Sequence, residues 1–406
     1  MNNRKHSSLY NYAGKVVIPM MEDQREKRDS DLLRQMQPLL TAFLFTGVDF
    51  RSQCSNECRI NVTCREILIK ISLAVIQIIT WIFVLVTIYG TIAIVDSTPI
   101  KHYISYQFME ILIIFLRSVL YWRRKDILNI LKHLSDVYDD IKHKSKNVNK
   151  GAISVLIVVF PGVHILGYGL VVLAFIVKGQ KKFMYFVLRK FSNIIPLTLP
   201  SYVYYLLGII DFWLFVVNIA SLCLFILLVL IVCTTLSHIL QDYRKSIKTS
   251  GITFEALQRR HIVVMNTVKR VDKCLSFPVF ILLGFHITLL FFLVAFFNYQ
   301  SNWKQKPSEI EIYFYFILIS YLIQYFVITT MASKVHEEMQ NIKIEVAEIS
   351  SRPSQLSAVE QILLIAKINS HSNICLTVWG FLNITKNFVF SSLGALLTFG
   401  ALFKDL

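Results

Sequence analysis

The chain has 406 residues, of which 55% are hydrophobic and 17% are charged, and its formal net charge is +16. This composition excludes an ordinary soluble globular domain, in which charged residues are more frequent. Because the Lys and Arg residues are concentrated between long apolar runs, loops that face the cytosol and anionic lipid explain the positive charge better than nucleic-acid binding does.

The first 65 or so residues are polar and basic and lack the apolar core of a signal peptide. Cys54, Cys58 and Cys64 lie in this segment, but no His lies among them and their spacing matches no zinc pattern. We therefore expect no metal site here. Nothing in the remaining sequence indicates a cofactor.

Seven apolar runs follow, and each predicts a membrane-spanning helix because backbone polar groups inside a bilayer must be satisfied internally. The run over 202–239 would form a helix of about 57 Å, nearly twice the ~30 Å hydrocarbon core. It is therefore either two spans or one span that continues beyond the membrane. The runs cover 71–95, 103–122, 152–177, 202–239, 276–298, 312–332 and 373–403.

The distribution of basic residues decides how many spans there are. With a cytosolic N-terminus and seven spans, the cytosolic segments carry 31 Lys and Arg residues and the external segments carry 9, as the positive-inside rule requires. Splitting 202–239 would move the eight basic residues of 241–275 outside. The sequence thus predicts an all-α membrane protein with seven transmembrane helices, a cytosolic N-terminus and an extracellular C-terminus.

The predicted cytosolic segments have the pattern of amphipathic helices. Residues 123–143 and 252–271 each place apolar side chains on one helix face. Ser357 and Glu360 have the spacing of a capping box that opens a further helix. Since such faces need a partner, we expect these extensions to pack on each other or on a neighbouring subunit.

Polar and aromatic residues within the spans are candidates for a ligand pocket, which needs aromatic walls and few polar anchors. Glu110 and Arg117, seven residues apart, share one face of the second span. For each candidate, an interhelical hydrogen bond is the alternative role. The candidate ligand-binding residues are Tyr106, Glu110, His164, Tyr168, Asp211, His286, Tyr321 and Gln324.

Motifs of common enzyme classes are absent: the chain has no P-loop, G-x-G-x-x-G, H-E-x-x-H, C-x-x-C or G-x-S-x-G sequence. An enzyme is therefore not expected. A secondary transporter is an alternative, because Pro161-Gly162 and Pro278 interrupt the third and fifth runs. A purely structural membrane protein is a third possibility.

The C-terminal segment over 380–406 resembles the arthropod gustatory receptor family, whose last helix ends in Thr-Tyr, five mostly apolar residues and Gln-Phe. Here Thr398 holds the Thr position and Phe399 stands for the Tyr. Asp405 and Leu406 replace the Gln-Phe pair. The segment over 33–40 is also similar to the stretch that precedes the first span in this family.

The resemblance implies a homotetrameric, ligand-gated, non-selective cation channel related to insect odorant receptors. In that family the last helix lines one central pore, and extended spans meet in a cytosolic anchor domain. The overlong run over 202–239 would then include an external lead-in and a cytosolic extension.

The candidate pore and gate residues are Thr398, Leu402, Asp405 and Leu406, which share one face of a helix over 386–406. Four copies of Leu402 would form a hydrophobic constriction that closes by dewetting. Four copies of Asp405 would form an acidic ring that favours cations. A terminal helix that faces lipid or packs in the bundle is the alternative.

We expect three parts in the chain: a cytosolic segment 1–70, a ligand-sensing region 71–332, and an anchor helix with the pore helix over 333–406. The extensions at 123–150 and 241–275 belong to the second part. The expected partners are a tastant or odorant, membrane lipid and further copies of the chain or a related subunit, in the plasma membrane of a chemosensory neuron. The sequence does not choose among sugar, bitter compound and volatile.

Overall fold

The computed structural model describes residues 31–50, 64–93, 100–141, 150–177, 200–248, 253–299, 308–349 and 375–402, with single positions between 357 and 366. A short helix α1 (Asp31–Ala42) and a 3-10 turn η1 (Phe43–Thr46) come first. The long helices are α2 (Cys64–Ala93), α3 (Ile100–Ile141), α4 (Lys150–Val177), α6 (Ser201–Lys248), α7 (Phe254–Tyr299), α8 (Ser308–Ile349) and α10 (Lys386–Leu402). Each long helix overlaps one predicted apolar run, which confirms the seven-helix prediction.

Four described helical segments are long and apolar enough to cross a membrane by length and composition alone: Gly151–Ala174, Tyr202–Lys248, Phe254–Val294 and Ile312–Glu348. Helix α6 has 48 residues and therefore extends about 72 Å, more than twice the ~30 Å hydrocarbon core. The run over 202–239 is thus part of one continuous helix that leaves the apolar layer.

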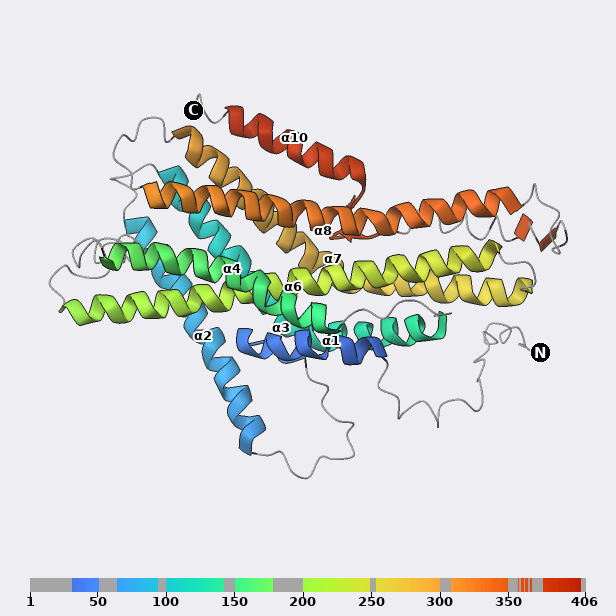
Figure 1. Ribbon diagram of the computed structural model, residues 1–406, viewed down its shortest axis with the longest axis horizontal. Coiled ribbons are helices and arrows are strands. Elements are labelled where there is room, and N and C mark those ends of the chain that lie inside the picture. Colours follow the sequence, from blue (N-terminus) through green and yellow to red (C-terminus); the bar gives the residue numbers. More distant parts are fainter. Residues whose placement is uncertain are drawn as a thin grey trace, which may run out of the picture.

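The ends of α6 and α8 and the start of α7 extend together to one side of the bundle, on the right of Figure 1. The apolar faces predicted from the sequence are buried there. On α3, Ile127 and Leu131 are 0% and 1% exposed, and on α7 both Val264 and Val268 are 0% exposed. Helices α3 and α7 pack on one another along these faces, so the amphipathic extensions do partner each other.

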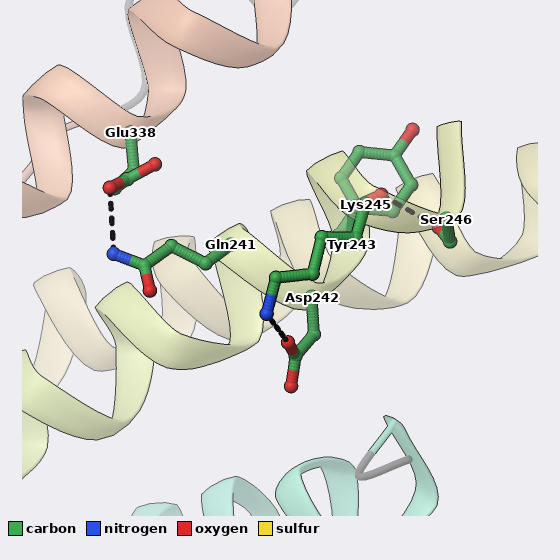
Figure 2. Close-up of polar contacts among 6 residues, drawn as sticks. All are labelled: Gln241, Asp242, Tyr243, Lys245, Ser246 and Glu338. Atoms are coloured by element: carbon green, nitrogen blue, oxygen red, sulfur yellow. Dashed lines mark hydrogen bonds and ion pairs between the residues drawn. The ribbon is translucent and has the colours of Figure 1, made fainter. Parts of the chain in front are cut away.

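Polar contacts join the extensions of α6 and α8. Gln241 Nε2 donates a 2.8 Å hydrogen bond to Glu338 (Figure 2), and Arg244 lies 3.3 Å from the same carboxylate. About two turns further along both helices, Lys248 and Glu345 form a 2.8 Å ion pair. The two glutamates are largely buried, so these contacts hold α6 and α8 in one register.

The last apolar run differs from its prediction. The apolar run begins at 373, but the helix begins at Lys386, where the candidate pore helix over 386–406 was expected to start. A hairpin of strands β1 (Thr377–Val378) and β2 (Leu382–Asn383) precedes it. Trp379 and Gly380 have φ values of 52° and 76°, and the Phe381 N–H donates to the Val378 carbonyl at 3.1 Å. Two central residues with positive φ are the mark of a type I′ turn, which suits a hairpin and not a helix.

The predicted interruptions at Pro161 and Pro278 are wrong. Helices α4 and α7 run through these prolines without a break. A proline removes one backbone donor, and neighbouring helices and local adjustment can compensate for it in a packed bundle. The predicted capping box is confirmed, because the Ser357 N–H donates to Glu360 at 2.8 Å and the Glu360 N–H donates to Ser357 Oγ at 3.3 Å.

Candidate ligand site and pore helix

Helix α4 comes close to α8 at Gly167. A Cβ atom at this position would lie 3.3 Å from Phe316 and 3.4 Å from Tyr313, both on α8. The absent side chain therefore permits a close helix crossing. His164 and Tyr168 lie on α4 immediately around this crossing and, four residues apart, share one helix face.

The amide of Gln324 on α8 joins two buried imidazoles from different helices. Its Nε2 donates to His164 Nε2 on α4 at 2.7 Å, and its Oε1 lies 3.4 Å from His286 Nε2 on α7. Ser320 Oγ is 3.1 Å from the same His164 nitrogen. On its other side, His286 Nδ1 donates to the Leu282 carbonyl at 2.8 Å. Three helices therefore meet at one amide.

Tyr321 supplies the aromatic wall of this meeting point. Its ring centroid lies 5.0 Å from that of His164 and 5.7 Å from that of His286. Phe285 makes an edge contact with the same ring at 5.7 Å. Only 4% of Tyr321 is exposed, so the ring lies among the helices and not at the lipid-facing surface.

One turn further along α4, Tyr168 connects to α6. Its hydroxyl donates a 2.8 Å hydrogen bond to Asp211 Oδ2, and both side chains are buried. The Phe215 ring stacks on Tyr168 with a centroid separation of 4.1 Å. A carboxylate is thus held beside an aromatic stack in the interior of the helix bundle.

Of the eight candidate ligand residues, six lie in these contacts, and we call them the polar cluster. Its members are His164, Tyr168, Asp211, His286, Tyr321 and Gln324. Helix α3, which carries the other two candidates, supplies none of the hydrogen bonds given above. Glu110 is half-buried on α3, and the side chain of Tyr106 lies outside the described residues.

The sequence did not identify Ser320, Phe215 or Phe316 as members of the same region. Ser320 precedes Gln324 by one helical turn, and Phe215 follows Asp211 by one turn. This i, i+4 spacing was the available signal. Within the described part of the chain, no group of three or more His, Cys, Asp or Glu residues is arranged to hold a metal ion.

Arg117 forms a second buried polar centre, which joins α2, α3 and α6. Its Nε donates to Gln77 at 3.0 Å, and its terminal nitrogens donate to Thr80 at 2.7 Å and to Asn218 at 3.2 Å. The residue is 0% exposed. The partners are neutral oxygens from the two neighbouring helices, so Arg117 acts as a link between helices.

Helix α10 packs on α7 and α8. Val389 and Leu396 are buried on the face toward the bundle, with exposed fractions of 6% and 8%. Thr398 is exposed, and its hydroxyl donates to the Gly394 carbonyl at 2.8 Å. The side chain of Leu402 and both Asp405 and Leu406 lie outside the described residues. Thr398 is therefore the candidate pore residue that the structure describes, on a face of α10 turned away from the bundle.

Two polar contacts attach α10 to α8. Lys386, the first residue of α10, pairs with Glu337 at 2.9 Å. Two turns further, Ser392 hydrogen-bonds to the hydroxyl of Tyr325. Helix α8 therefore holds both the start and the middle of α10.

The chain matches the family described as 7tm chemosensory receptor over residues 36–400. Among solved structures it is similar to the insect olfactory receptor OR5 from Machilis hrabei in complex with eugenol, with 12% identity, a TM-score of 0.60, and coverage of 92% of this chain and 98% of that chain. For another structure of OR5 from Machilis hrabei, the identity is 11%, the TM-score 0.60 and the coverage 91% and 97%. No curated protein matches the sequence. At such low identity, the structural likeness establishes the fold that the two proteins share.

Proposed function

The chain belongs to the 7tm chemosensory receptor family, and from this we propose that it is a ligand-gated, non-selective cation channel opened by a small extracellular molecule. As a member of that family it is a membrane receptor and not an enzyme. The resemblance found in the C-terminal segment is confirmed at the level of the family.

The polar cluster supports the proposal of a ligand site. It combines aromatic walls with a few polar groups from four helices, which is the composition that a small-molecule pocket requires. Gln324 carries this argument, because its amide contacts His164 and His286 on separate helices. A molecule that competes for either contact would alter the packing of α4, α7 and α8 against each other. We propose that Tyr106 and Glu110 of α3 complete the pocket.

We further propose that four copies of α10 surround a cation pore. Thr398, Leu402, Asp405 and Leu406 would face its axis, with Leu402 as the apolar gate and Asp405 as an acidic ring that attracts cations. The exposed position of Thr398 and the buried position of Leu396 support this orientation of α10.

For the arrangement in the membrane, we propose that the N-terminus and segments 1–70, 123–150, 241–275 and 334–372 are cytosolic and that the C-terminus is extracellular. The supporting observation is the excess of basic residues in these segments, 31 against 9. The packed extensions of α3, α6, α7 and α8 would form the anchor domain of a homotetramer, or of a heteromer with a related subunit, in the plasma membrane of a chemosensory cell.

Whole-cell recording from cells that express the full chain tests this function. The panel should hold sugars, bitter compounds and volatiles, with eugenol as the first probe because the similar OR5 structure contains it. A ligand-evoked or constitutive cation current that Leu402→Ala alters is expected. No current in cells that display the chain at their surface, together with a monomeric purified protein, would contradict the proposal. Continuous α4 and α7 helices give the transporter alternative no support.

A further inference from the structure

Gln324 and Tyr325 are consecutive residues of α8 that contact different parts of the molecule. Gln324 reaches His164 on α4 in the polar cluster, whereas Tyr325 reaches Ser392 on α10. Successive side chains of an α-helix point about 100° apart. Two adjacent residues of α8 therefore contact the candidate ligand site and the candidate pore helix, respectively.

The contact between Tyr325 and Ser392 has a defined direction. Ser392 Oγ donates its proton to the Val389 carbonyl at 2.9 Å, so it accepts the hydrogen bond from the Tyr325 hydroxyl. Tyr325 is 0% exposed, and its ring is held among helices. Because the phenol has few ways to rotate there, a displacement of α8 has to move or break its bond to α10.

Helix α8 is suited to act as a rigid connection. Its 42 residues contain neither Pro nor Gly, whereas α4 and α7 contain Pro161 and Pro278. The Tyr325 carbonyl accepts a further 2.7 Å hydrogen bond from the buried Thr329, one turn along the same helix. Helix α8 also pairs with α6 through Glu338 and with the start of α10 through Glu337.

We propose that Tyr325 is a positioning residue that couples the polar cluster to α10, by passing the contact between Gln324 and His164 on to Ser392 through two adjacent residues of α8. A change at His164 then alters the stability of α10 only while the Tyr325 hydroxyl is present. The consequence for current rests on the proposed function, but the coupling itself is a property of the fold and can be measured without a ligand.

Amide hydrogen exchange over 386–402 in the purified full chain tests this coupling. The four proteins are the wild type, His164→Ala, Tyr325→Phe and the double variant. His164→Ala should change the exchange rate of α10 amides about fivefold or more. In the Tyr325→Phe background the same substitution should change it less than about twofold. His164→Leu, which keeps the volume of the side chain filled, should change the exchange rate of α10 as His164→Ala does. Ser392→Ala, which removes the hydrogen-bond acceptor, should weaken the effect of His164→Ala as Tyr325→Phe does.

The matched control is Tyr315→Phe on α8, since 54% of Tyr315 is exposed; in this background His164→Ala should retain its full effect on α10. An effect of equal size with and without the Tyr325 hydroxyl would overturn the proposal, and so would an α10 that does not respond to either His164 variant. Absence of any cation current would instead contradict the proposed function, so the two failures are distinguishable.

Discussion

Asp272 on α7 accepts a 2.6 Å hydrogen bond from the backbone N–H of Thr377, the first residue of the hairpin. The Thr377 hydroxyl contacts both oxygens of the same carboxylate at 3.0 Å, and the Trp379 N–H donates to the Ser276 carbonyl at 3.3 Å. Because α10 begins directly after this hairpin, at Lys386, Asp272 helps to fix the point from which the candidate pore helix starts.

This contact predicts a pH-dependent stability. Burial raises the pKa of Asp272 above its ordinary value, and the hydrogen bonds from Thr377 offset only part of the rise. The folded state therefore binds this proton more strongly than the unfolded state does, so the stability from protonation is present at low pH and is lost as pH rises through the folded-state pKa. The melting temperature of the wild type relative to Asp272→Asn should accordingly be higher at pH 5 than at pH 7.

The measurement is thermal unfolding of the purified full chain at the two pH values. Asp126→Asn, which changes an exposed aspartate on α3, is the control and should keep a constant offset from the wild type. A difference between the wild type and Asp272→Asn that does not change with pH would contradict this account of the carboxylate.

Removal of the Tyr168 hydroxyl should weaken the link between α4 and α6. Tyr168→Phe deletes the 2.8 Å donor to the buried Asp211 while it keeps the stacked ring. Hydrogen bonds between membrane helices contribute about 0.6–1.7 kcal/mol, so a loss of about 1 kcal/mol is expected. A lower melting temperature of the purified protein would show this loss of stability. A shifted ligand potency would show that the hydrogen bond also matters for ligand response. Tyr202→Phe, at a residue that is 70% exposed, should leave both unchanged; equal effects from the two variants would contradict the assignment.

Arg117→Lys should destabilise the fold although it preserves the charge. A lysine ammonium lacks the planar fork that reaches Gln77, Thr80 and Asn218 together. The expected cost is about 2 kcal/mol, because hydrogen bonds from a buried charged group are lost. Size-exclusion chromatography after a series of heating steps would reveal a lower midpoint. Lys125→Arg, an exposed conservative exchange on α3, serves for comparison; a wild-type midpoint for Arg117→Lys would refute the role of this link.

The sequence predicted the helices well because hydrophobic periodicity and helix length are local properties. The faces that carry Ile127 and Val264 were identified and are buried. The apolar run over 373–403 began too early for the last helix, since hydropathy alone does not distinguish an apolar hairpin from a helix, whereas the pore helix proposed over 386–406 has the observed start at Lys386. The positive φ values of Trp379 and Gly380 belong to a tight turn. The mean hydropathy of the segment carries no information about that turn.

The candidate ligand site was predictable as a set of residue types and not as a geometry. Intramembrane His164 and Asp211 are unusual enough to be noticed in a sequence. Their partners lie 160 and 43 residues away in the chain, at Gln324 and Tyr168. Such pairings depend on how α4 crosses α6 and α8, which Gly167 helps to set through the close approach of Phe316. Helix crossings of this kind are tertiary information.

If α10 lines a cation pore, a cysteine on its pore-facing side should become accessible to a reagent in the permeation path. Thr398 is exposed and Leu396 is buried against the bundle, and two residues correspond to about 200° around a helix. A cationic methanethiosulfonate reagent applied during recording should therefore block the current of Thr398→Cys and spare that of Leu396→Cys and the wild type. Block of Leu396→Cys alone, or a current that neither cysteine makes sensitive, would contradict a pore lined by this face of α10.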